Sequence, residues 1–200
     1  MKTKPQQFDL FGRAASGPWE EHDLDRRADF QAVAVAGGHE YKAIAFKYLT
    51  AAGARIVRDG FRVGPFPVDA EIMGPSGNRF LVLMHGTPDA HAQSGLRRVD
   101  TLEKAGFFAM QLRRDQELPI LLLTSDLPYP GSRAAQYLAK LSEDVWDVIA
   151  TRGDLGNYRR LSRVLRSPDL ASPPDAPWRD GSMTTRAGTR QRTLDLKMDP

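Results

Sequence analysis

The sequence predicts one α/β domain, and three observations lead to this prediction. A helix-like segment over residues 38–53 precedes a series of short alternating segments, as in a sheet that follows a helix. A short apolar run, PILLLTSDLP (residues 119–128), lies between two further helix-like segments, as in a strand covered on both faces. The 200 residues suit one domain of about 150 residues with extensions.

The first half of this domain reads as a helix followed by three strands. Ile44, Tyr48 and Ala52 recur at four-residue spacing, and Gly53 is a stop signal for the helix. The alternating segment ARIVRDGFRVGPF then predicts a strand with a DG turn. VDAEIM and RFLVLMH follow as two strands, and GPSGN between them has the composition of a hairpin loop.

The second half reads as helix, buried strand, helix and basic helix. The segment over residues 96–114 predicts a helix with an apolar side made of Leu96, Val99, Leu102, Phe107 and Met110. After the buried strand, Ser132 is expected to open a helix with the core stripe Ala135, Leu138, Leu141, Val145 and Ile149. A last helix, capped by Asp154 and ending at Arg166, is apolar on one face and arginine-rich on the other.

These elements divide the chain into four parts. We expect an N-terminal extension over residues 1–37, a core over 38–150, a basic C-terminal helix over 151–167 and a disordered tail over 168–200. Disorder is predicted for the tail because it is rich in Pro, Ser, Thr and Gly and has no apolar periodicity.

Composition excludes several classes of function. The chain has no cysteine, so disulfides, thiolate metal sites and cysteine nucleophiles are excluded, and its four histidines lack zinc-hydrolase spacing. It has no P-loop and no serine-hydrolase elbow. The three tryptophans do not form a base-stacking row, and Trp146 is expected in the core. No run of about 18 apolar residues occurs, so we expect a cytoplasmic protein without a membrane partner.

The positive charge is concentrated at the C-terminus. Residues 151–200 hold ten Lys and Arg against six Asp, which leaves residues 1–150 with 18 basic and 19 acidic side chains. Of the 28 basic residues 21 are Arg, the better bidentate partner of phosphate. Either a contact with a polyanion or a solvated tail accounts for this distribution.

The predicted order αβββαβα, with a mixed central sheet flanked by helices, resembles the core of the restriction-endonuclease-like, or PD-(D/E)xK, nucleases. The resemblance covers roughly residues 38–150 and implies a helix-borne Glu, an Asp at the start of the second strand and a (D/E)xK motif in the third. Glu40 and Pro67-Val68-Asp69 match the first two features. Where Glu-x-Lys is expected, the chain has Leu83-Met84-His85.

This departure affects the chemistry that the resemblance implies. Mg²⁺, or Mn²⁺ in its place, needs carboxylate oxygens, and Leu83 supplies none. Asp69 and Glu71 are two apart on a strand, hence on one face about 6 to 7 Å apart, and could form a displaced metal site with His85 as base or donor and Glu40 in support. In the alternative, both carboxylates are the polar face of a strand whose Val68, Ala70 and Ile72 face the core.

Arginines provide the expected contacts with nucleic acid. Arg97 and Arg98 stand at the start of a predicted helix, where they suit a DNA phosphate or pair with Asp100 and Glu103. The basic helix adds Arg159, Arg160 and Arg163.

Three hypotheses follow. The first is a DNA-acting protein of this nuclease superfamily with an incomplete catalytic set, which binds DNA and cleaves it weakly or not at all. The second is an active Mg²⁺-dependent DNA endonuclease that uses Asp69, Glu71 and His85. The third is a non-catalytic scaffold that binds a protein partner.

Overall fold

The computed structural model describes residues 37–88, 95–152, 155–170, 173 and 175–179. The chain divides into two units, Met1–Gly37 and Gly38–Pro200, and the description below concerns the second. The predicted N-terminal extension, except its last residue, and the tail from residue 180 onward lie outside the described residues.

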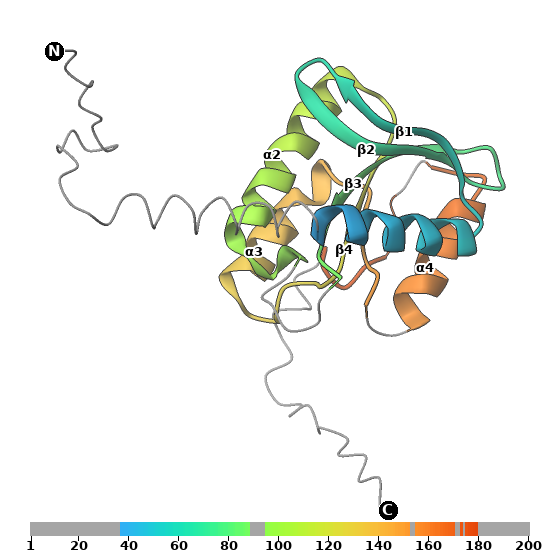
Figure 1. Cartoon of the computed structure of the whole chain (residues 1–200). Helices are drawn as coiled ribbons and strands as arrows, with labels where there is room; N and C mark the ends of the chain where they lie inside the picture. The colour runs from blue at the N-terminus through green and yellow to red at the C-terminus, as the bar shows by residue number, and fades with distance from the viewer. Residues whose placement is uncertain (1–36, 89–94, 153–154, 171–172, 174, 180–200) are drawn as a thin grey trace, which may run out of the picture. The chain divides into compact units, whose positions relative to one another are not determined.

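The unit is an α/β domain with a five-stranded mixed open sheet and four helices within the described residues. A helix over residues 37–51, blue in Figure 1, comes first. The other elements are β1 (Arg55–Val63), β2 (Phe66–Met73), β3 (Arg79–His85), the 3-10 turn η1 (Gly95–Arg97), α2 (Val99–Asp115), β4 (Ile120–Thr124), α3 (Arg133–Lys140), the 3-10 turn η2 (Leu141–Glu143), β5 (Asp147–Ala150) and α4 (Leu155–Arg166).

The strands lie in the order β1-β2-β3-β4-β5. The pairs β1·β2 and β2·β3 are antiparallel, whereas β3·β4 and β4·β5 are parallel. The predicted hairpin between β2 and β3 is confirmed, and the amide of Gly74 donates to the carbonyl of Asn78 at 2.8 Å within its loop. The carboxyl ends of β3, β4 and β5 therefore lie at the same edge of the sheet.

Two apolar layers cover the sheet. On one face, Leu81, Leu83 and Leu122 pack with residues of α2 and α3. On the other face, Phe80 and Val82 pack with residues of the helix over 37–51 and of α4. Figure 1 shows the helices arranged around the sheet in this way. The strand β4 is buried along its whole length, as its uninterrupted apolar run predicts.

Two apolar stripes differ from the prediction. At the first helix Ala52 is buried as predicted, and so are Ala45 and Leu49, which lie beside the predicted stripe, whereas Ile44 is 42% exposed and Tyr41 is buried in its place. In α2 the buried residues are Leu102, Ala105, Gly106, Ala109 and Leu112. Phe107 and Met110, expected on the core side of α2, are exposed, because small residues let this helix pack closely against α3 and the sheet. The size of a side chain thus misled the prediction of the buried face.

The helix expected to continue to Ile149 ends much earlier. Ser132 caps α3 as predicted, and its Oγ accepts the amide of Ala135 at 3.1 Å. The helix stops at Lys140, and Val148 and Ile149 belong to the fully buried strand β5. β-branched residues have high strand propensity, and the two apolar layers bury opposite faces of β5, Val148 in one layer and Ile149 in the other. Five strands therefore replace the four expected.

The ordered domain extends beyond residue 167, where the disordered tail was expected to begin. Ala176 and Trp178 are buried, and the Trp178 indole Nε1 donates to Asp147 Oδ1 at 2.9 Å. The guanidinium of Arg179 donates to the carbonyls of Ser142 and Val145, each at 2.8 Å. Residues 175–179, which lie within the segment predicted to be disordered, thus pack against the domain through the buried side chain of Trp178.

Among the described residues, every helix is too short or too polar to cross a lipid bilayer.

Candidate functional site

The predicted metal residue Asp69 lies where β2 separates from β3. Ala70 and Val82 are the last residues that pair there, and Asp69 Oδ2 accepts the amide of Met84 at 2.7 Å in place of a strand carbonyl. Burial is the largest influence on this carboxyl group and raises its pKa, although the Met84 amide and Lys42 oppose the shift. The carboxylate of Asp69 thus has a structural role in the hairpin.

The alternation of faces along β2 is irregular around Asp69. Val68 and Ala70, two residues apart, pack into opposite core layers. In the neighbouring strand β1 the register shifts between Ile56 and Arg58, and Gly60 has a φ of 54°. The regular period of two, from which the sequence placed Asp69 and Glu71 on one face, therefore does not hold across this part of β2.

Glu71 is buried and already has a cationic partner. It lies opposite Leu81, on the face of the sheet that α2 covers, and forms an ion pair with the guanidinium of Arg79. Leu83, which replaces the expected carboxylate, is 1% exposed within the apolar layer. Neither residue offers an oxygen to a cation beside Asp69.

His85 ends β3 as a neutral side chain. Its Nε2 is enclosed and has no hydrogen-bond partner among the described residues. Burial, with a smaller contribution from the positive charge of Lys104, lowers the pKa of His85 to about 4. His85 therefore cannot supply the positive charge that the Lys of the nuclease motif provides.

The four predicted catalytic residues do not form a metal site. Glu40 is exposed in the first turn of its helix. Within the described ranges, no group of three or more His, Asp or Glu side chains is arranged to hold a metal ion. Because Glu71 is paired with Arg79 and Asp69 with an amide, the donor set does not fit Mg²⁺ or Mn²⁺.

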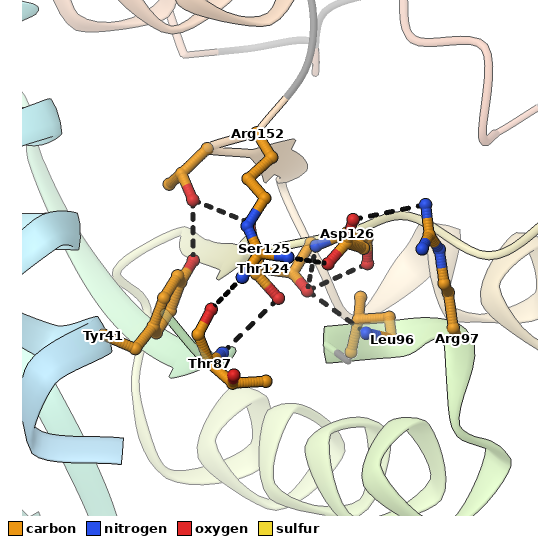
Figure 2. Close-up of polar contacts among 9 residues, drawn as sticks. Tyr41, Thr87, Leu96, Arg97, Thr124, Ser125, Asp126 and Arg152 are labelled. Carbon is orange, nitrogen blue, oxygen red and sulfur yellow. Dashed lines mark hydrogen bonds and ion pairs between the residues drawn. The ribbon is translucent and has the colours of Figure 1, made fainter. Parts of the chain in front are cut away.

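A second group of polar side chains joins the carboxyl ends of the parallel strands, and we call it the strand-end cluster. It consists of Tyr41, Thr87, Arg97, Thr124, Ser125, Asp126, Thr151 and Arg152, most of which Figure 2 labels. Asp126 is at its centre: its Oδ1 pairs with Arg97 at 3.2 Å and its Oδ2 with Arg152 at 3.1 Å. Two guanidinium groups thus share one nearly buried carboxylate.

The remaining contacts tie the ends of β4 and β5 to η1 and to the helix over residues 37–51. Thr124 Oγ1 donates to the carbonyl of Asp126 at 3.0 Å and accepts the amide of Leu96 at 3.1 Å. Gly95, next to Leu96, has a φ of 64°, and a side chain there would collide with Thr124. Thr151 donates to the hydroxyl of Tyr41 at 3.3 Å, and burial raises the pKa of that hydroxyl. These hydrogen bonds fix the strand ends, so the cluster is a structural element of this edge.

The sequence did not indicate most of this cluster. Ser125-Asp126 follows a buried strand, which is a recognisable position for polar side chains in an α/β sheet. Thr151 and Arg152 follow β5, and this strand was hidden within a predicted helix. Correct assignment of β5 is the signal that would have placed both residues at the same edge as Asp126.

The predicted DNA contacts Arg97 and Arg98 both have acidic partners. Arg97 pairs with Asp126, and its guanidinium lies 4.5 Å from the ring centre of Tyr129. Arg98 donates to both carboxylate oxygens of Asp100, and this pairing is the alternative that the sequence left open. Neither arginine is a free cation in the structure.

The arginines of α4 differ sharply from one another. Arg160 is 8% exposed; its Nε donates to Asp147 Oδ2 at 2.9 Å and its Nη2 to the carbonyl of Val148 at 2.6 Å. Arg160, a predicted DNA contact, is thus bound to a buried carboxylate and does not belong to the exposed arginines of α4. Arg159, Arg163 and Arg166 are exposed, have no ion-pair partner among the described residues and share one shallow surface, which we call the α4 arginine face.

A groove of about 390 Å³ adjoins this face, and we call it the α4 groove. Its lining includes Trp146, Arg163, Val164, Asp169, Leu170 and Asp175. A second hollow of about 370 Å³, beside Trp178, shares Arg160, Arg163 and Asp175 with it. Trp146, expected in the core, is only partly buried and borders the groove.

No family model, curated protein or solved structure matches this chain.

Proposed function

We propose that this chain is a DNA-binding protein with a restriction-endonuclease-like core, and that its incomplete catalytic set leaves it without metal-dependent cleavage. DNA would contact the α4 arginine face. The observation that carries the proposal is a contrast between two regions. Three exposed arginines on α4 have no acidic partner among the described residues, whereas the carboxylates of the β2–β3 hairpin are paired.

The order of elements supports the core. A helix, three antiparallel strands, a helix, a strand parallel to β3 and a further helix follow one another, which is the order that the sequence resemblance implies. β5 adds a strand at the far edge of the sheet and leaves the hairpin at its expected place.

The positions of the arginines support a phosphate contact. Arg159, Arg163 and Arg166 are four and three residues apart on α4, and at about 1.5 Å per residue they span roughly 10 Å along the helix. DNA has a phosphate charge about every 1.7 Å of its axis, so a row of this length meets several phosphates. Since the arginines have no acidic partner among the described residues, they need not break an ion pair to bind.

Two measurements on the full chain test the proposal. Fluorescence anisotropy of a labelled duplex at several salt concentrations should show binding that weakens steeply with salt, because bound cations release counterions. A plasmid-nicking time course with Mg²⁺ and with Mn²⁺ should leave the plasmid intact with the wild type and with Asp69→Ala alike.

The other two hypotheses make different demands on the same measurements. Nicking by the wild type that Asp69→Ala abolishes would identify an active endonuclease with a displaced metal site. Absence of any salt-dependent duplex binding would remove the DNA proposal and favour a protein-binding scaffold, which a pull-down of a defined partner would then have to support.

A further inference from the structure

We propose that the free edge of β1 binds an extended acidic segment of a partner protein, which joins the sheet as an additional strand. The proposal concerns a surface other than the α4 arginine face and does not depend on the proposed DNA binding. It rests on the difference between the two edges of the sheet and on the charges of β1.

Side chains of the domain itself occupy the outer edge of β5. The amide of Val148 donates to Asp147 Oδ1 at 2.7 Å, and the carbonyl of Val148 accepts Arg160 Nη2 at 2.6 Å. Just before the strand, the carbonyl of Val145 accepts Arg179 Nη2 at 2.8 Å. A further strand could pair with β5 only if it displaced these side chains, so this edge is closed.

The outer edge of β1 has no such cover within the described residues. β2 is the only segment of these residues that pairs with β1, and no other hydrogen bond joins the β1 backbone to them. β1 lies at the outside of the sheet in Figure 1, and none of its nine residues is buried. An edge strand of this kind presents amide and carbonyl groups that an extended peptide can bind.

The irregular backbone of β1 limits what can pair there. The register with β2 shifts between Ile56 and Arg58, and Gly60 has a φ of 54°. Irregularities of this kind protect a sheet edge from unselective pairing. Backbone hydrogen bonds alone therefore do not determine the partner, and the side chains of β1 have to select it.

The side chains of β1 favour an acidic partner. Arg55, Arg58 and Arg62 are exposed and have no acidic partner among the described residues. Asp59, the one acidic residue of the strand, is already paired with Lys42 at 2.7 Å. Opposite charges on facing strand residues stabilise the pairing of strands, whereas like charges destabilise it. A strand rich in Glu or Asp therefore matches this edge.

A second copy of this chain matches the edge less well. Two β1 strands side by side would bring six arginines next to two aspartates, three and one from each copy. An Asp59 that faced an arginine of the other copy would also have to leave Lys42. The charges that attract an acidic strand thus oppose self-pairing.

The experiment compares two labelled peptides of about ten residues, the upper end of the usual strand length. One consists of alternating Glu and Val, the other of alternating Lys and Val, and in an extended chain each presents a row of like charges on one face. Fluorescence anisotropy with the full chain measures both affinities at the same salt concentration. We expect the Glu peptide to bind at least about tenfold more tightly than the Lys peptide, because opposite-charge pairs replace like-charge pairs.

Charge reversal locates the binding on β1. Arg58→Glu with Arg62→Glu should invert the preference, so that the Lys peptide binds more tightly. Arg114→Glu with Arg133→Glu, a matched control of exposed arginines on α2 and α3, should keep the preference of the wild type. If the first variant does not fold, Arg58→Gln with Arg62→Gln should still weaken the preference.

Amide hydrogen exchange distinguishes an added strand from attraction between charges. Exchange of the outward-facing amides of β1 should slow when the Glu peptide is bound, because the peptide carbonyls accept them. Inversion of the preference by both charge-reversed variants, or binding that leaves exchange in β1 unchanged, overturns the proposal in favour of a general effect of net charge.

Other roles of the edge would be detected in the same assays. If neither peptide binds, the arginines only protect the edge from pairing, and the proposal falls. A dimer in sedimentation that excludes the Glu peptide would assign the edge to a second copy. Loss of duplex binding in Arg58→Glu with Arg62→Glu, but not in the control, would assign it to DNA. If no duplex binds the wild type, the DNA proposal falls, and the peptide titration still decides this one.

Discussion

The β2–β3 hairpin and α4 show opposite relations between charge and availability. In the hairpin, Asp69 accepts a strand amide and Glu71 pairs with Arg79, so carboxylates that look catalytic in the sequence have structural partners. In α4, Arg160 is buried and bound to Asp147. Arg159, Arg163 and Arg166 are exposed and have no ion-pair partner within the described residues. The arginines of α4 can therefore bind a ligand without breaking an ion pair, whereas the carboxylates of the hairpin would first have to leave their partners.

The largest loss of stability is expected for a variant at the contact between α4 and β5. Asp147→Ala would leave the buried Arg160 guanidinium and the Trp178 indole without their acceptor. We expect a loss of about 3–5 kcal/mol in the free energy of unfolding, since an uncompensated charge stays in the core. Urea denaturation measures it, with Asp115→Ala as an exposed control. A loss below about 1 kcal/mol would show that α4 does not depend on this ion pair.

The second largest change in stability is expected from His85, and it depends on pH. Because the pKa of His85 is about 4 in the folded protein and near 6.5 when unfolded, the unfolded chain takes up the proton first as pH falls. Between pH 6.5 and 4 the wild type should therefore lose up to about 3 kcal/mol through this residue. Urea midpoints across this pH range should be flatter for His85→Gln and unchanged for exposed His39→Gln. Equal slopes for wild type and His85→Gln would contradict the burial of neutral His85.

A third variant tests whether the α4 arginine face binds DNA. Arg159, Arg163 and Arg166 replaced together by Gln should lower the slope of log affinity against log salt by about 2–3, at roughly 0.9 per lost phosphate contact. Replacing exposed Arg113, Arg114 and Arg133 on α2 and α3 removes the same charge elsewhere. If both triple variants change the slope equally, net charge and not the α4 arginine face determines binding.

The smallest change in stability is expected for Asp69→Asn, a variant that separates the role of the Asp69 charge from that of its hydrogen bond. Asp69→Asn keeps an oxygen acceptor for the Met84 amide and removes the charge that burial disfavours. Since the folded-state pKa is raised, the stabilising contribution of Asp69 is complete at low pH and is lost as pH rises through that pKa. Asp69→Asn should thus be more stable than wild type at pH 7, and the difference should shrink as pH falls and the wild-type carboxyl group takes up its proton. Clear destabilisation at pH 7 would mean that the charge itself holds the hairpin.

Local patterns were sufficient for several parts of this molecule. GPSGN predicted the hairpin loop, the apolar run before Thr124 predicted a buried strand, and Ser132 predicted the start of α3. Each of these features depends on residues that are close together in the chain, where turn chemistry and side-chain period act directly.

By itself, the sequence determined the α/β class, the hairpin and the arginine-rich helix. The tertiary structure alone decided that β5 pairs beside β4, that Val68 and Ala70 pack into opposite core layers, and that Trp178 is buried while Trp146 borders a groove. Strand pairing and burial depend on residues far apart in the chain, which compete for the same partners and the same apolar surface. That competition decides which charged side chains remain without a partner, and no local sequence pattern predicts the outcome.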